Sequence, residues 1–277
     1  MYFISLIWLP ALLLTVAECK ILVKREIQRD THNYVIGPTV KPEDAHKYRY
    51  QVALCKDCGF HCGGALISSR HILTAAHCVH KINPRPMTIK AGMIYVDDRI
   101  NGQIRDVISI KIHRNYNSVT HVYDLALLTL KEPLDLTNLT VVKLPEVNED
   151  FDGEVIEARS VIEMSGWGKT NDLTYAHYTV KNNTAVRDCL APSKLCADYS
   201  SNMRIWPGDS GGPAVIRRGK DVILVGVVSG VTYAEQDFFS NVAHLRSWID
   251  SAMKEGEEVI NVVDELLHQL PKHTCTY

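Results

Sequence analysis

Short runs of apolar and β-branched residues, separated by turn-forming residues, make up most of the chain. Examples are residues 50–54, 64–67, 72–75, 125–130 and 222–228. Ile108, Ile110 and Ile112 alternate with polar residues, as in a strand with one buried face. The pattern therefore predicts a chain dominated by β-strands.

Helical spacing appears only near the C-terminus, over residues 242–254 and again over 259–270. Since no helical segments separate the strands, the pattern disfavours a doubly wound α/β sheet and favours an antiparallel barrel or sandwich. We expect residues 257–277 to form an extra amphipathic helix. Its apolar stripe either packs on the domain, as most such stripes do, or meets a partner.

The first seventeen residues form a nearly continuous apolar run that is short for a membrane span and ends in small residues. They predict a signal peptide over 1–17, followed by a propeptide over 18–34, a domain over 35–256 and an extension over 257–277. No Lys or Arg precedes the apolar run, so an uncleaved anchor is the alternative. We expect a secreted, extracellular protein with no membrane association after signal removal.

Composition narrows the function further. The 277 residues are 46% hydrophobic, which is enough for a large core, and the formal net charge is −2 with no basic block for nucleic acid. The 12 histidines show no metal-ligand spacing, so we expect no metal and no cofactor. Secretion suits the eight cysteines and two candidate glycosylation sites, Asn138 and Asn182.

Three segments carry the residues needed to break an amide bond. A serine hydroxyl becomes a nucleophile when a histidine takes its proton and a buried carboxylate fixes the tautomer of that histidine. Ser210 lies in Gly-Asp-Ser-Gly-Gly-Pro, whose glycines aim the amides of Gly208 and Ser210 at one point, an oxyanion hole. His77 ends a strand-like run, and Asp124 precedes an apolar strand. We predict that Ser210 is the nucleophile, His77 the general base and Asp124 the orienting residue.

These segments resemble the catalytic motifs of the chymotrypsin/trypsin family of serine proteases, in its His, Asp, Ser chain order. The resemblance also includes Ser-Gly-Trp-Gly at 165–168, Cys-Gly-Gly at 62–64 and Ser-Trp-Ile at 247–249. It implies an all-β fold of two packed six-stranded antiparallel β-barrels with a C-terminal helix. It further implies a secreted serine-type endopeptidase, a hydrolase made as a zymogen and acting on protein or peptide substrates.

The resemblance implies activation by cleavage, after which the new α-amino group of Val35 pairs with Asp209. The residue before Val35 is Tyr34 rather than Arg or Lys, so we predict cleavage by a chymotrypsin-like protease or by the enzyme itself. Pro38 stiffens the segment that must move.

The resemblance places the specificity pocket at Arg204, Asp237 and Ser229, the last of which supports the catalytic aspartate in the family. Arg204 stands where trypsin carries an aspartate, so basic substrates are disfavoured. A buried Arg204 would pair with Asp237, because either charge alone would be costly to bury. The alternative is that Arg204 points to solvent. We expect non-tryptic cleavage after small, apolar or acidic residues.

The resemblance also implies a disulfide between Cys62 and Cys78, which holds the histidine loop. Cys189 and Cys196 would close a loop shorter than the family's usual one before the serine. The pairing of Cys19, Cys55, Cys58 and Cys275 stays open: Cys19 could tether the propeptide, or Cys55 could bond Cys58.

Two other functions compete with a protease. The first is a catalytically silent homologue that acts as a binding or regulatory module, because a fold does not guarantee activity. The second is an α/β hydrolase, whose nucleophile elbow also fits the sequence around Ser210, but that fold needs its Asp and His after the serine. For the protease we expect a monomer that meets protein substrates and protease inhibitors.

Overall fold

The computed structural model describes residues 37–57, 59–84, 87–98, 101–146, 158–168, 170–181, 189–199, 205–231 and 236–269. By its contacts the chain divides into two units, Met1–Asn33 and Tyr34–Tyr277, and the elements below belong to the second. Several predicted features lie outside the described residues, namely the signal peptide, the propeptide, Val35, Asn182, Arg204, Cys19, Cys58 and Cys275.

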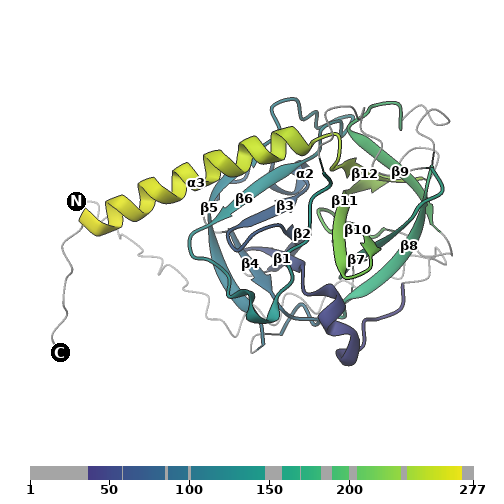
Figure 1. The fold of residues 1–277 in the computed structure, drawn as a ribbon, viewed down its shortest axis with the longest axis horizontal. Helices are drawn as coiled ribbons and strands as arrows, with labels where there is room; N and C mark the ends of the chain where they lie inside the picture. The colour runs from purple at the N-terminus through teal and green to yellow at the C-terminus, as the bar shows by residue number, and fades with distance from the viewer. Residues whose placement is uncertain are drawn as a thin grey trace, which may run out of the picture. The chain divides into compact units, whose positions relative to one another are not determined.

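Six antiparallel strands close the first barrel (Figure 1). They are β1 (Gln51–Lys56), β2 (Gly59–Leu66), β3 (His71–Thr74), β4 (Met87–Ala91), β5 (Gln103–Ile112) and β6 (Ala126–Leu130). Their order around the barrel is β1-β2-β3-β6-β5-β4. The predicted alternation along β5 is interrupted by a register shift between Val107 and Ser109, and Ile110 and Ile112 beyond it pack against the core.

Six further antiparallel strands close the second barrel in the order β10-β11-β12-β9-β8-β7. They are β7 (Val161–Gly166), β8 (Thr174–Val180), β9 (Lys194–Tyr199), β10 (Pro213–Arg218), β11 (Asp221–Val231) and β12 (Asp237–Asn241). The predicted fold of two six-stranded barrels with a C-terminal helix is confirmed.

The two barrels are in contact along β2, which meets β10 and β11. A buried hydrogen bond of 2.8 Å joins them, from Ser165 Oγ on β7 to Gln51 Oε1 on β1. Trp167, also fully buried, donates its indole N–H to the carbonyl of Ile94 at 3.0 Å. Because buried polar groups must be paired, these bonds fix how one barrel sits against the other.

Three short helices accompany the strands: η1 (Pro42–Tyr48) precedes β1, α2 (Ala76–Val79) follows β3 and η2 (Leu136–Asn138) follows β6. Asn138, a candidate glycosylation site, ends η2 and is exposed. Its position leaves the side chain accessible from solvent.

The C-terminal helix α3 runs without a break over Arg246–Gln269. The sequence pattern suggested two helical stretches and a boundary at residue 256, but that position lies inside one helix. The helix packs on β5 and β6 of the first barrel. Among the described residues, no helix is both long and apolar enough to cross a membrane.

Gly256 is the point where α3 approaches the barrel most closely. A Cβ at this position would lie 2.7 Å from His71 Nε2 and 2.8 Å from Thr129 Oγ1. One turn on, Ile260 is also buried. The beginning of the predicted C-terminal extension therefore docks on the domain.

Candidate active site

The pairing of β3 with β6 brings His77 and Asp124 to the same end of the first barrel. Thr74, the last residue of β3, lies opposite Ala126, the first of β6. His77 follows in α2, and Asp124 lies just before β6. Residues that follow one antiparallel strand and precede its neighbour meet at a common edge.

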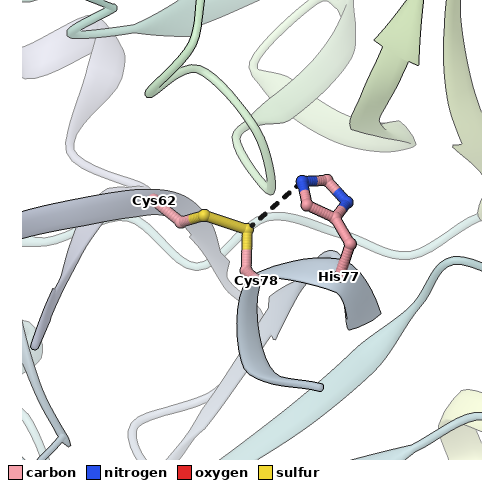
Figure 2. A group of neighbouring side chains, drawn as sticks. All are labelled: Cys62, His77 and Cys78. Carbon is pink, nitrogen blue, oxygen red and sulfur yellow. Dashed lines mark hydrogen bonds between the residues drawn. A yellow bond between two sulfur atoms is a disulfide. The ribbon is translucent and has the colours of Figure 1, made fainter. Parts of the chain in front are cut away.

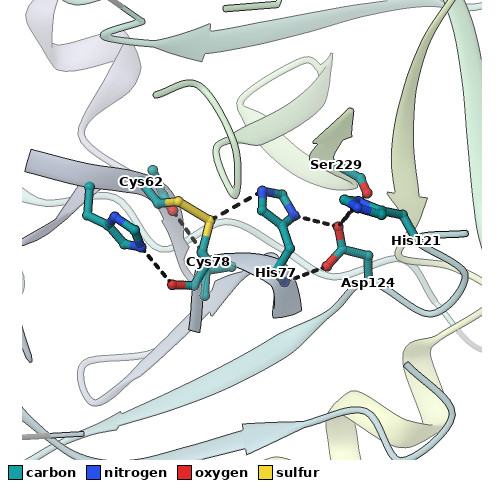
Figure 3. Close-up of a disulfide and its surroundings, with 9 residues drawn as sticks. Cys62, His77, Cys78, His121, Asp124 and Ser229 are labelled. Atoms are coloured by element: carbon teal, nitrogen blue, oxygen red, sulfur yellow. Dashed lines mark hydrogen bonds and ion pairs between the residues drawn. A yellow bond between two sulfur atoms is a disulfide. The ribbon is translucent and has the colours of Figure 1, made fainter. Parts of the chain in front are cut away.

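Asp124 holds His77 by two hydrogen bonds (Figure 3). Nδ1 of His77 lies 2.7 Å from Asp124 Oδ2, and the backbone amide of His77 donates to Oδ1 at 2.8 Å. A carboxylate accepts but cannot donate, so it places the proton of a neutral imidazole on Nδ1. The other ring nitrogen, Nε2, is then left able to accept a proton.

Two serines from the second barrel hold Asp124 in place. Ser229 Oγ donates to Asp124 Oδ2 at 2.5 Å, and Ser240 Oγ donates to the backbone carbonyl of Asp124 at 2.6 Å. The carboxylate is fully buried. Burial by itself would raise the pKa of Asp124, but contacts from His121, His77 and Ser229 outweigh it and hold this pKa well below its ordinary value. The side chain is therefore a buried anion.

Ser210 lies in the turn before β10, and hydrogen bonds join this turn to β2 and β11. The amide of Gly63 donates to the carbonyl of Ser210 at 2.8 Å, and the amide of Gly211 donates to the carbonyl of Val228 at 2.8 Å. Gly208 has φ +106°, and a Cβ there would collide with the carbonyl oxygen of Gly168. The turn therefore requires glycine at this position.

Among the described residues, the amides of Gly208 and Ser210 donate to no hydrogen bond. Paired donors of this kind suit an oxygen that gains negative charge.

Among the described residues, no hydrogen bond joins Ser210 Oγ to His77. His77 Nε2 instead contacts Cys78 Sγ at 3.8 Å (Figure 2).

Asp209, next to the serine, is buried and bound by backbone amides. Its Oδ1 accepts from Gly168 N at 2.8 Å and its Oδ2 from Trp206 N at 2.9 Å. Burial raises the pKa of Asp209 to about 6, the two amides oppose this rise, and the charge of Asp237 adds to it. Its predicted partner, the α-amino group of Val35, lies outside the described residues.

Of the predicted specificity residues, Asp237 is fully buried at the start of β12. The hydroxyl of Ser229 donates its hydrogen bond to Asp124 rather than pointing to a substrate pocket. Arg204 lies outside the described residues, so its pairing with Asp237 stays a prediction.

The structure joins both predicted cysteine pairs, Cys62 with Cys78 and Cys189 with Cys196. The first bond ties β2 to α2 beside His77 (Figure 3). Cys55 is buried in β1, and the pairing of Cys19, Cys58 and Cys275 stays open.

His121 also belongs to this site, although no motif in the sequence predicted it. Its ring lies 5.2 Å from that of His77, between centroids, and its Nδ1 lies 3.4 Å from Asp124 Oδ2. The only signal in the sequence is the spacing of three residues between His121 and Asp124.

Two closed six-stranded barrels, with histidine, aspartate and serine in this chain order where they meet, define the class of trypsin-like serine proteases. The family model described as Trypsin matches residues 38–249, and the chain belongs to this family.

Relatives of the chain carry different names. It is 32% identical to glucanase inhibitor protein 3 of Phytophthora infestans, over 79% of this chain and 88% of that one. It is 30% identical to hypodermin-A of Hypoderma lineatum, over 78% and 85% of the two chains. Among solved structures, human heparin binding protein aligns with a TM-score of 0.67 and 25% identity, over 79% of this chain and 97% of that one.

Proposed function

We propose that the protein is a secreted serine endopeptidase that hydrolyses peptide bonds through an acyl-enzyme on Ser210. The observation that carries this proposal is the buried carboxylate of Asp124, which binds both Nδ1 and the backbone amide of His77. This arrangement prepares the imidazole to act as a base.

In the proposed reaction, Ser210 Oγ attacks the carbonyl carbon of the substrate while His77 Nε2 takes the hydroxyl proton. The amides of Gly208 and Ser210 donate to the oxyanion, and His77 then gives the proton to the leaving amine. Water repeats the sequence on the acyl-enzyme and regenerates Ser210. For the first transfer, Ser210 Oγ turns toward Nε2 when substrate binds.

We assign a non-tryptic specificity to the pocket. Arg204 at the base of the pocket disfavours basic substrates. An ion pair between Arg204 and Asp237 would fill the base and make the pocket shorter. The full burial of Asp237 supports this view, because a buried carboxylate is stabilised by a charged partner. A positional-scanning peptide library tests it. Dominant cleavage after Lys or Arg would contradict the assignment, and Asp237→Gly should increase cleavage after acidic residues.

Activation is proposed to follow cleavage after Tyr34, when the ammonium group of Val35 pairs with Asp209. The raised pKa of Asp209, about 6, supports this, since among the described residues its carboxylate is bound by backbone amides rather than by a cation. N-terminal sequencing of the active protein should begin at Val35.

A fluorescent fluorophosphonate tests the activity itself. The processed protein should be labelled at Ser210, and Ser210→Ala should abolish labelling. His77→Ala should fold normally and react far more slowly, because the hydroxyl loses its base.

The second candidate is a silent homologue that binds other proteins. Two observations favour it. Within the described residues no hydrogen bond joins Ser210 to His77, and the relatives include proteins named glucanase inhibitors. A processed protein that is folded but unlabelled would establish this function over the first.

A further inference from the structure

His121 is held beside the catalytic pair by an unusual backbone conformation. Its φ is +53°, in the left-handed region that side chains rarely adopt. The amide of His121 donates to the carbonyl of Asn117 at 2.8 Å, and Asn117 Oδ1 accepts from Val119 and Thr120. These bonds close the loop and aim the imidazole at Asp124.

The environment of His121 fixes its ring on several sides. The ring lies 5.2 Å from His77, 6.3 Å from Phe238 and 6.5 Å from Tyr116, between centroids. Its Nδ1 is buried and makes no hydrogen bond among the described residues, although it lies 3.4 Å from Asp124 Oδ2. A buried ring nitrogen without a hydrogen-bond partner therefore faces a buried carboxylate.

Three possible metal ligands converge at this point. Nδ1 of His77 lies 2.7 Å from Asp124 Oδ2 on one side, and His121 Nδ1 lies 3.4 Å from it on the other (Figure 3). All three side chains offer ligand atoms within 4.8 Å of one another. Zinc bonds nitrogen and oxygen at about 2.0–2.2 Å, so its tetrahedral ligands lie about 3.3 Å apart.

We propose that His77, His121 and Asp124 form an inhibitory site for a divalent transition metal such as Zn²⁺. Two imidazoles and a carboxylate are a donor set that zinc prefers, and water would complete the tetrahedron. The contact of His121 with Asp124 already has the required spacing. The shorter contact of His77 with Asp124 opens as the metal replaces the shared proton.

The inhibitory effect follows from where the proton goes, and this step rests on the proposed protease function. In the free site the ring proton of neutral His77 is on Nδ1, shared with Asp124. A metal bound to Nδ1 displaces that proton to Nε2, with no net proton lost or gained. His77 then carries N–H where it must accept the proton of Ser210, so it is no longer a base.

The neighbouring sulfur atoms do not offer a rival site. Cys62 and Cys78 also lie close to His77, but they are joined in a disulfide and provide no thiolate (Figure 2). Ser229 keeps its place as a donor to Asp124 Oδ2. The metal site therefore consists of the two histidines and the aspartate.

The loop conformation determines the best variant for a test. His121→Asn removes the imidazole, and asparagine tolerates a positive φ better than most residues. His121→Gly is a second variant that also tolerates it, in case the first one misfolds. His80→Asn is the matched control, since His80 contacts Tyr116 at 5.4 Å, between ring centroids, but is not one of the three ligands.

Zinc binding to the full chain is measured by calorimetry and by competition with a chromophoric chelator. We expect one tight site in the wild type and in His80→Asn, and at least about tenfold weaker binding in both His121 variants. Equal affinity in folded wild type and His121 variants would overturn the proposal. So would the absence of a tight site in the wild type.

Two further readouts separate this proposal from the protease function. Zinc should slow fluorophosphonate labelling of the wild type and of His80→Asn but not of His121→Asn. If no chain is labelled even without zinc, the protease function fails while the binding measurement still decides the metal site. Nitrogen NMR of the His77 ring should show the proton on Nε2 in the zinc complex, and a proton on Nδ1 would overturn the inhibitory step.

Discussion

Ser229 on the second barrel donates a 2.5 Å hydrogen bond to Asp124 at the edge of the first. The acceptor is a fully buried carboxylate, so the bond counts among the stronger ones in a protein. The second barrel thus helps to position the residue that orients His77.

Ser229→Ala should destabilise the protein by about 1.5–3 kcal/mol, because a buried charge loses a donor. It should also slow fluorophosphonate labelling. Ser240→Ala is the matched control, since its hydroxyl serves only the neutral carbonyl of the same residue. It should cost about 1 kcal/mol and leave labelling nearly unchanged. Thermal melts and labelling rates measure both effects, and equal slowing in the two variants would refute the role of Ser229.

The raised pKa of Asp209 predicts a stability that depends on pH and on processing. A carboxyl with a folded pKa of about 6, against 3.8 for an unperturbed aspartate, stabilises the fold at low pH, and this contribution disappears as the pH rises through 6. The ammonium group of Val35 would remove the cost of the buried charge. A chain that starts at Val35 should therefore melt higher at about pH 8 than one that keeps Tyr34, and the difference should shrink near pH 5.

Asp209→Asn provides the control for this comparison. It removes the charge that the ammonium group would meet, so the two starting points should then melt at the same temperature. If the two chains with Asp209 intact already melt alike at about pH 8, the ion pair does not form.

His71, fully buried under α3, predicts a second pH effect of opposite sign. Burial lowers the pKa of His71, Glu257 opposes this and Arg70 adds to it. A group whose folded pKa is depressed contributes stability above its unfolded pKa of about 6.5, and loses it as the pH falls below that value. Replacing His71 by Gln should therefore flatten the fall in melting temperature on acidification, whereas His46→Gln, on the surface, should not.

Gly256→Ala tests whether α3 docks on the barrel at this residue, because helix propensity and docking have opposite effects on stability here. In an exposed helix this change would stabilise by about 1 kcal/mol. Here the new Cβ would lie 2.7 Å from His71 Nε2, so we expect a net loss of about 1–3 kcal/mol in unfolding free energy. Asn261→Ala, at an exposed position of the same helix, should be neutral or slightly stabilising. A stabilised Gly256→Ala protein would mean that α3 does not dock at this point.

Much of the fold could be predicted because strands and motifs are local signals. The apolar runs around Ile72 and Leu127 became β3 and β6, and the motif around Ser210 led to the family. His121 could not be found in this way. Its place beside His77 depends on the positive φ of His121 itself and on the hydrogen bonds of Asn117 that close the loop. Neither feature gives a periodic pattern in the sequence.

The full length of α3 could not be predicted from the hydrophobic pattern either. Glycine followed by two glutamates at 256–258 reads as a polar break between two helices, whereas the glycine is buried against the barrel. Only the shape of the neighbouring surface, with His71 and Thr129 pressed close, explains why a residue without a side chain belongs inside this helix.

The unbroken course of α3 sets the direction in which this helix leaves the barrel. Ile249, Gly256 and Ile260 are buried along one helix, so the barrel also sets the direction of the last turns of α3, up to Gln269. Inserting one residue between Ile249 and Gly256 would rotate the rest of the helix by about 100° about its axis. Gly256 would then no longer face the barrel. A second protein fused after Gln269 through a continuous helix would therefore be held rigidly relative to the barrel. Each helical residue added at the junction would rotate the fused protein by about 100° about the helix axis.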